Sequence, residues 1–291
     1  MKPTSLVLAI ACSVLVLKAL AAPVLARDIY VDNAAGNDLG TGIAPTLNDP
    51  VSGPVRSIRR ALVLAKDGDV VILKNNNTPY YESISLTGVR HNGLTTAPFL
   101  IQGNGATISG LSSLPAAAWF AVGVDLWKVT PAKKGWYQLV HDGKVVPEIR
   151  VPAGAVERPE LPPGHWYAWK GTIYYRSLPD ENVLTESFSL SREDVGVSLH
   201  RVRNVRIENL VVQHFRIDGI NAHDGCRNVE LVNVISQENG RAGLVAAGTS
   251  DLILSRGKLL GNREYSLLVT ERAAAEVNES ELSAPAVIAD E

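Results

Sequence analysis

The sequence predicts an all-β solenoid, and three observations support this prediction. Segments beginning at Asn204, Asn228 and Asp251 align at intervals of 24 and then 23 residues. Each contains three short runs of alternating polarity, such as VRI, LVV and GINAH in the first, and polar or glycine-containing turns separate these runs. A fixed period in this range is typical of solenoids. Three strands and three corners per repeat favour a parallel β-helix over a leucine-rich horseshoe, whose second half is leucine-rich and often helical.

The N-terminal part of this solenoid is expected to carry one helix. Apolar residues recur at helical spacing, and basic residues occupy the other face; the apolar set is Val55, Ile58, Ala61, Leu62 and Ala65. Pro54 and Gly68 bracket the run. Because the unpaired strand edges of a first coil would template aggregation, we expect this helix to cap that end. The runs DVVIL, ISL and FLIQG that follow are expected to form the first coils, so that cap and first coils together span residues 27–114.

Residues 115–195 differ from the rest in composition and predict a small antiparallel β-insert. All five tryptophans lie there, together with two hairpin patterns, LVHDGKVV and WYAWKGTIYYR. Aromatic side chains on strands can stack against sugars, which makes Trp166 and Trp169 candidate substrate-binding residues. They can also form the core that a unit of this size needs, and we favour this second interpretation. Residues 196–291 then return to coils of 23 to 24 residues.

Aligning the coils predicts which side chains point inward. With Gly219, Gly243 and Ser266 in register, the following residues Ile220, Leu244 and Leu267 lie inside, and Asn221, Val245 and Leu268 lie outside. This outer face is mostly apolar, so we expect something to cover it, the insert being the nearest candidate. Asn209 and Asn233 also share a register and predict a short amide ladder at one corner.

The chain starts with a pattern typical of an export signal. Residues 1–26 contain a basic residue, an apolar stretch too short to span a bilayer, and small residues before two candidate cleavage points. We therefore expect a secreted, periplasmic or cell-surface protein with no membrane association after cleavage; a lipoprotein modified at Cys12 is the alternative. Cys226 is then the only thiol of the mature chain, which excludes an intrachain disulfide.

Charge and motifs limit the partners and cofactors. With 28 basic and 30 acidic residues, the chain lacks the electrostatic footprint of a nucleic-acid-binding protein. It contains no zinc-ligand spacing, phosphate-binding loop or nucleophile motif, so we expect no cofactor and no metal site. Calcium held by scattered carboxylates stays open, because its ligands need no fixed spacing. The oligomeric state is not predicted.

Several stretches resemble a known family. IYVDNAAGNDLGTG, GPVRSIRRALVLAKDGDVVIL and APFLIQGNGATISGLSSL resemble the opening of secreted right-handed parallel β-helix proteins of the pectate-lyase-like superfamily, and WKGTIYYRSLP, VRNVRIENLVV and DGI are similar to the same group. The resemblance implies a right-handed parallel β-helix and a polysaccharide partner. These stretches build coils and turns rather than an active site, so they imply no particular reaction.

Four residues are candidates for acid–base catalysis: Asp218, His223, Asp224 and Glu238. They are predicted to lie on one coil face and its corners within two neighbouring coils, close enough to act on one sugar linkage. Asp224 also registers two coils from Glu271, about 9–10 Å away, which is near the upper end of the carboxylate separation in inverting glycosidases. The alternatives are a turn-forming role for Asp218 and ordinary solvation for the others.

Two functions are consistent with these features. The first is a secreted polysaccharide-active enzyme, a lyase or a glycoside hydrolase, in which Arg216 could bind the carboxylate of a uronate. The second is a non-catalytic extracellular protein that binds carbohydrate or serves a structural role on a surface. The superfamily resemblance favours the enzyme, and the apolar outer face favours the binding protein.

Overall fold

The computed structural model describes residues 26–47 and 51–289, so the predicted export signal lies outside the described residues except for Ala26. Over the described ranges the chain is almost entirely β-strand and irregular structure, with one short α-helix, α1 (Ile58–Leu64), and one 3₁₀ turn, η1 (Ala116–Ala118). No helix within these ranges is long and apolar enough to cross a membrane.

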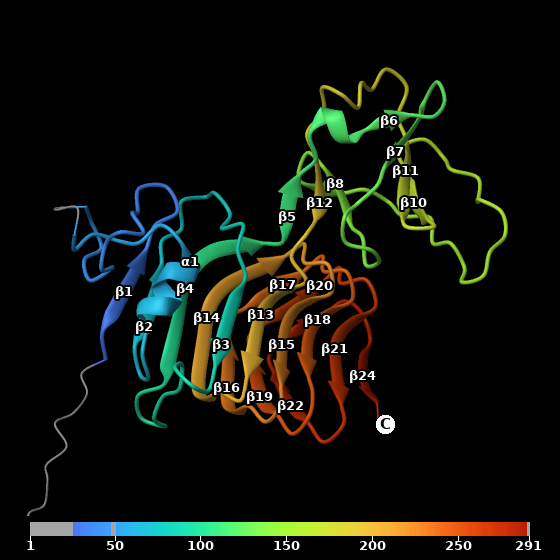
Figure 1. Cartoon of the computed structure of the whole chain (residues 1–291). Helices are drawn as coiled ribbons and strands as arrows, with labels where there is room; N and C mark the ends of the chain where they lie inside the picture. Colours follow the sequence, from blue (N-terminus) through green and yellow to red (C-terminus); the bar gives the residue numbers. More distant parts are fainter. Residues whose placement is uncertain (1–25, 48–50, 290–291) are drawn as a thin grey trace, which may run out of the picture.

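Two long parallel sheets run along the molecule (Figure 1), and side chains of both form one apolar core. The first sheet takes one strand from each successive coil, in the order β1 (Asp28–Val31), β2 (Val70–Leu73), β4 (Phe99–Ser109), β14 (Arg203–Gln213), β16 (Arg227–Val232), β19 (Asp251–Ser255) and β22 (Ala274–Asn278), and is extended by β17 (Ile235–Gln237), β20 (Lys258–Leu260) and β23 (Glu281–Leu282). The second consists of β3 (Ile84–Thr87), β13 (Val195–His200), β15 (Asp218–His223), β18 (Ala242–Ala246), β21 (Tyr265–Thr270) and β24 (Ala286–Ala289). Stacked coils of this kind are consistent with a parallel β-helix.

The predicted register of the coils is confirmed. Ile220 pairs with Leu244, which pairs in turn with Leu267, and all three side chains are buried. They belong to one continuous apolar core that runs through the stacked coils. Outside, Val245 is buried, whereas Asn221 and Leu268 are partly exposed.

The corners between strands explain the repeated asparagines. Asn209, Asn233 and Arg256 occupy the same corner of successive coils, and all three have φ between 51° and 53°. This left-handed conformation is disfavoured for most L-residues but tolerated by asparagine. The predicted amide ladder is present, since Asn233 Nδ2 donates to Asn209 Oδ1 at 2.7 Å. A second, buried ladder joins Asn239 Nδ2 to Asn262 Oδ1 at 2.9 Å.

Helix α1 is shorter than the apolar pattern suggests. Ser57 caps its N-terminus by accepting from the amide of Arg60, and Val55 instead forms a β-bridge with Val31. The helix packs on β1, β2 and β3. His91 fixes it there: its Nδ1 accepts from the amide of Thr87 at 3.1 Å, so its Nε2 carries the proton and donates to the carbonyl of Leu62 at 3.1 Å.

A buried carboxylate anchors the start of the coils. Burial by itself would raise the pKa of Asp32, but hydrogen bonds from Lys74, from Asn76 and from the amides of Ala34 and Ala35 outweigh it and lower the pKa to about 2. Lys74 Nζ lies 2.8 Å from the Asp32 carboxylate.

An antiparallel insert is placed between β4 and β13 and projects from the upper edge of the coils in Figure 1. One of its two sheets contains β5 (Leu111–Ser113), β12 (Phe188–Ser191), β8 (Leu139–His141) and β9 (Lys144–Val145), and the other contains β10 (Trp166–Trp169), β11 (Thr172–Arg176), β7 (Leu126–Val129) and β6 (Phe120–Ala121). Both expected hairpins are present, with positive φ at Asp142–Gly143 and Lys170–Gly171.

The insert has its own aromatic core and a narrow connection to the coils. Its buried cluster, separate from that of the coils, contains Trp119, Tyr137, Trp166, Tyr175 and Phe188 among others. The chain leaves the coils at Gly110 and returns beside it, because the amides of Arg192 and Glu193 both donate to the Gly110 carbonyl, at 2.8 and 3.2 Å.

Candidate functional site

The four predicted catalytic residues do not form one site. Asp218 begins strand β15 and His223 ends it, so five residues of extended chain, about 16 Å, separate them. Asp224 follows His223, whereas Glu238 lies at the corner that leads into β18, near the Asp218 end of the sheet. The expectation that all four act on one linkage is therefore wrong, because it treated the two ends of a strand as neighbours.

Asp218 has a structural environment. Its side chain is buried and accepts from Arg241, Nη2 to Oδ2 at 2.6 Å and Nε to Oδ1 at 2.9 Å, and from Asn221 Nδ2 at 2.9 Å. This bidentate ion pair joins two successive coils. Its two oxygens are thus engaged within the protein.

Arg216 and Arg263 hold the insert against the coils. Arg216 is buried, pairs with Asp194, and donates through Nη2 to the carbonyls of Lys134 and Gly135 at 2.9 and 2.7 Å. Its guanidinium is therefore occupied by groups at the junction between the insert and the coils. This does not fit the expected role of Arg216 in binding a uronate. Two coils away, Arg263 pairs with Glu148 of the insert at 2.8 Å.

The two candidate tryptophans differ in exposure. Trp166 is buried in the insert, and its indole N–H donates to the Val146 carbonyl at 2.9 Å, so it presents no free face to a sugar. Trp169 is partly exposed, with the Lys170 ammonium 5.5 Å from its ring centroid.

Glu238 forms a pair with His214, which occupies the same corner one coil earlier. His214 is buried, and its Nε2 lies 2.8 Å from Glu238 Oε2. This hydrogen bond lowers the pKa of the Glu238 carboxyl, although burial opposes the effect.

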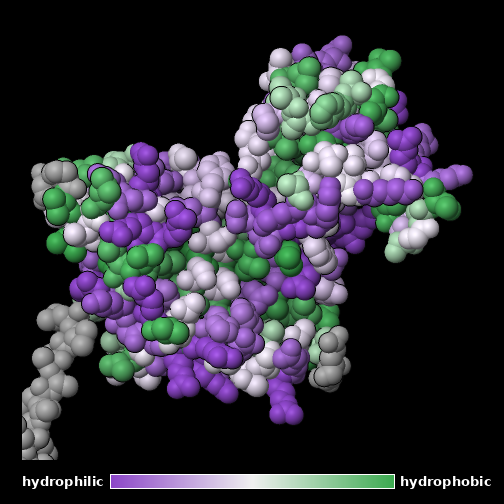
Figure 2. Space-filling view, in the orientation of Figure 1, coloured by the Kyte–Doolittle hydropathy of each residue, from purple (hydrophilic) through white to green (hydrophobic). Residues whose placement is uncertain are grey.

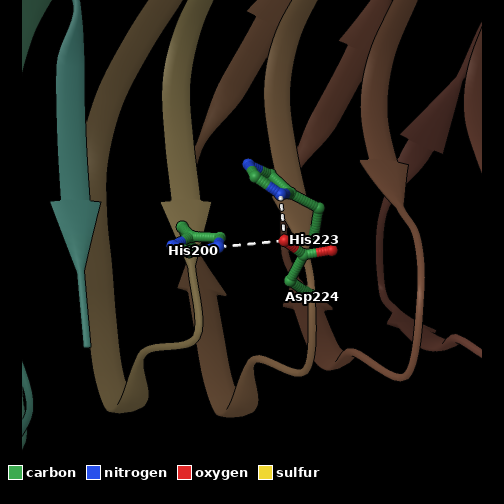
Figure 3. Close-up of side chains that lie close together, drawn as sticks. All are labelled: His200, His223 and Asp224. Carbon is green, nitrogen blue, oxygen red and sulfur yellow. Dashed lines mark hydrogen bonds and ion pairs between the residues drawn. The ribbon is translucent and has the colours of Figure 1, made fainter.

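A second histidine–carboxylate cluster lies at the opposite end of the second sheet (Figure 3). His200 and His223 are register partners at the ends of β13 and β15, with ring centroids 5.0 Å apart. Asp224 Oδ2 lies 2.9 Å from His200 Nε2 and 3.6 Å from His223 Nδ1. The hydrogen bond from His200 is the main cause that lowers the pKa of Asp224.

The sequence contained a signal for His200 that the repeat alignment missed. GVSLHRVRNV and GINAHDGCRNV place His200 and His223 at the same position, one coil earlier than the first aligned segment. Extending the repeat backward would have paired the two imidazoles.

A pocket of about 620 Å³ opens where α1, β3 and the base of the insert meet. Its polar lining includes Ser83, Ser85, Arg59 and Arg90, and Leu62 and Val63 of α1 contribute the apolar part. Hydrophilic side chains gather where the insert meets the coils in Figure 2.

Glu82, Glu193 and Tyr81 line this same pocket, as does Asp38, whose Oδ1 accepts from the amides of Arg56 and Ser57 and whose Oδ2 accepts from the Ser57 hydroxyl. Glu82 precedes β3, and its two oxygens accept from the amides of Ile58 and Arg59 at 3.2 and 3.1 Å. Burial raises the pKa of Glu82, and these hydrogen bonds only partly offset that effect. Glu193 enters from the returning end of the insert, and Tyr81 is 61% exposed at the rim. Sequence reasoning did not identify Asp38, Glu82, Glu193 or Tyr81.

Comparisons with known proteins give a fold and no family. No family model matches the chain, and no curated protein matches it. Two solved structures are similar: "The complex structure of XylC with xylose", with a TM-score of 0.56 and 12% identity over 87% of this chain, and "Glycoside hydrolase", with a TM-score of 0.60 and 12% identity over 84%. The chain spans 58% of the XylC chain and 68% of the glycoside hydrolase chain. At this identity the likeness supports the fold alone.

Proposed function

We propose that the protein acts on carbohydrate as a glycoside hydrolase and that the pocket beside α1 is its active site. The observation that carries the proposal is the pair of carboxylates, Glu82 and Glu193, on the walls of one pocket. Glycoside hydrolysis uses two carboxyl groups flanking the scissile bond, with the pKa of the acid raised. The two similar structures, one of XylC solved with xylose and one named a glycoside hydrolase, support the same substrate class.

The environments of the two carboxylates suggest their roles. Burial raises the pKa of Glu82, which favours the protonated form that a general acid needs, and the two amides of α1 fix its orientation. Glu193 is the second carboxylate, acting either on water or on the sugar itself. Exposed Tyr81 offers an aromatic face for a sugar ring, and the serines on β3 offer hydroxyls for hydrogen bonds.

The proposal also includes the fold family, the cap, the export and the polysaccharide substrate that the sequence indicates. The coils form a right-handed β-helix of the pectate-lyase-like kind, α1 caps its open end, and the protein is exported and acts on a polysaccharide. The resemblance of IYVDNAAGNDLGTG and the following stretches supports the first assignment, and the pattern of residues 1–26 supports export.

The test is a screen of the purified protein on neutral and acidic polysaccharides, including xylans, that follows both reducing ends and unsaturated uronate absorbance. We expect new reducing ends without unsaturated products. Glu82→Gln and Glu193→Gln should each reduce the rate by about 10²- to 10⁴-fold, whereas Glu157→Gln, an exposed carboxylate in the insert, should leave it unchanged. Unsaturated products would show that the protein is a lyase and not a hydrolase. Full activity in both Glu82→Gln and Glu193→Gln would show that the active site lies outside this pocket.

A non-catalytic carbohydrate-binding protein is the second candidate. The outward row of the second sheet favours it, because this row carries no charge; it consists of Ser85, Ser198, Asn221, Val245, Leu268 and Val287. Retention of a polysaccharide without cleavage, lost in Tyr81→Ala and kept in Phe120→Ala, would support this candidate. Phe120 is a matched control because it is a similarly exposed aromatic residue in the insert.

A further inference from the structure

The His200, His223 and Asp224 side chains converge on one point from two neighbouring coils (Figure 3). Parallel pairing places the two imidazoles side by side, because both residues end their strands pointing outward. Asp224 then enters the left-handed region, with φ 61°, and its carboxylate lies between the two rings. Three atoms, one from each residue, lie within 4.8 Å of one another.

These separations are close to those of a metal-ligand set. In a tetrahedral site with bonds of 2.0–2.2 Å, two ligand atoms are about 3.3 Å apart. The two distances to Asp224 Oδ2, 2.9 Å from His200 Nε2 and 3.6 Å from His223 Nδ1, lie on either side of that value. All three side chains are partly exposed, so a fourth position can be taken by water.

We propose that His200, His223 and Asp224 bind one divalent transition-metal ion, with Zn²⁺ as the reference ion. Two imidazoles and one carboxylate suit Zn²⁺ and its transition-metal neighbours, whereas Ca²⁺ and Mg²⁺ prefer oxygen ligands alone. The ion bridges β13 and β15 and so links two successive coils through side chains. This proposal goes beyond the proposed hydrolysis and departs from the expectation of no metal site.

Another cluster in the described part of the chain provides a matched control. His141, Asp142 and Glu186 of the insert also bring three candidate ligand atoms within 4.8 Å. That cluster has a single imidazole, and its ring stacks on Phe188 with centroids 4.2 Å apart. We therefore expect no comparable transition-metal binding there.

The test is a calorimetric titration of untagged, chelator-treated protein with Zn²⁺, Ca²⁺ and Mg²⁺. We expect saturable binding of one Zn²⁺ per chain and none of comparable strength for Ca²⁺ or Mg²⁺. His200→Gln, His223→Gln and Asp224→Asn should each weaken Zn²⁺ binding at least about 10-fold, in line with the contribution of ligand-shell groups, and His141→Gln should leave it unchanged. Wild-type protein should also gain melting temperature with Zn²⁺, a gain that the ligand variants lose.

A measurement on the wild-type protein keeps the proposal testable if a variant folds poorly. With ¹⁵N-labelled histidine, Zn²⁺ should shift the ring resonances of two of the six histidines, and Co²⁺ should give the intense visible bands of a four-coordinate site. Failure to bind Zn²⁺ at one per chain, binding that survives His200→Gln combined with His223→Gln, or binding lost in His141→Gln would each overturn the proposal.

Discussion

Replacing Arg241 with methionine should destabilise the coils strongly, because it leaves the buried Asp218 carboxylate without its cation. The substitution removes two charge-assisted hydrogen bonds, of 2.6 and 2.9 Å, and leaves one neutral bond from Asn221. Breaking a buried ion pair from one side costs about 3–5 kcal/mol. Since the Arg241 side chain is 29% exposed, we expect the lower end of that range, about 3 kcal/mol.

The opposite substitution should cost less. In Asp218→Asn the partly exposed guanidinium can turn toward water, so the free energy of unfolding should fall by about 1–2 kcal/mol. The double variant should be more stable than Arg241→Met alone, because no charge stays buried. Urea unfolding followed by circular dichroism measures all three. A loss below about 1 kcal/mol in Arg241→Met, or a larger loss in Asp218→Asn than in Arg241→Met, would contradict the reasoning.

Three further predictions concern other parts of the coils. The pKa of Asp32 falls from 3.8 to about 2 on folding, so its carboxylate contributes up to about 2 kcal/mol to the free energy of unfolding. This contribution is complete above pH 4 and is lost as the pH falls through 2. Asp32→Asn should therefore lower the urea midpoint at pH 6 and leave it unchanged at pH 2. The buried Cys226 thiol, whose pKa is raised by burial, should react with a thiol reagent only at the rate of unfolding, and labelling of the native protein within seconds would refute this. Asn233, at φ 51°, should tolerate glycine better than alanine by about 1 kcal/mol in melting or urea experiments, and equal stabilities would contradict the backbone explanation.

The repeat could be predicted from the sequence, but its cause could not. Alternation along GINAH and GLVAA determined which residues point inward, because the period of a strand is fixed by geometry. The repeated asparagines suggested side-chain ladders, and Asn233 does bond to Asn209. The stronger requirement is the left-handed backbone, which Arg256, Glu238 and Glu271 also adopt without any asparagine-like signal.

The candidate pocket was beyond sequence reasoning for a different reason. It joins Asp38, Arg59, Glu82 and Glu193, residues up to 155 positions apart, and Glu193 reaches it only because the insert returns to the corner it left. Periodicity within the coils says nothing about where an interruption of the repeat ends. The expectation that Asp218 and Asp224 act together was wrong for a related reason. The repeat register shows which residues lie beside each other in successive coils, but Asp218 and Asp224 are separated along one strand.

The narrow connection of the insert has a consequence for how the coils assemble. Strand β14 must pair with β4 across the 93 residues that lie between Ser109 and Arg203, and the length-dependent entropy of closing such a loop costs about 4 kcal/mol when it is unstructured. Once the insert has folded, its two ends meet at the Gly110 carbonyl, and the effective loop between β4 and β14 shrinks to about 12 residues, for which the same quantity is about 2 kcal/mol. Folding of the aromatic core of the insert therefore favours the pairing of β14 with β4. It does so through chain connectivity alone, because no side chain of the insert takes part in that pairing.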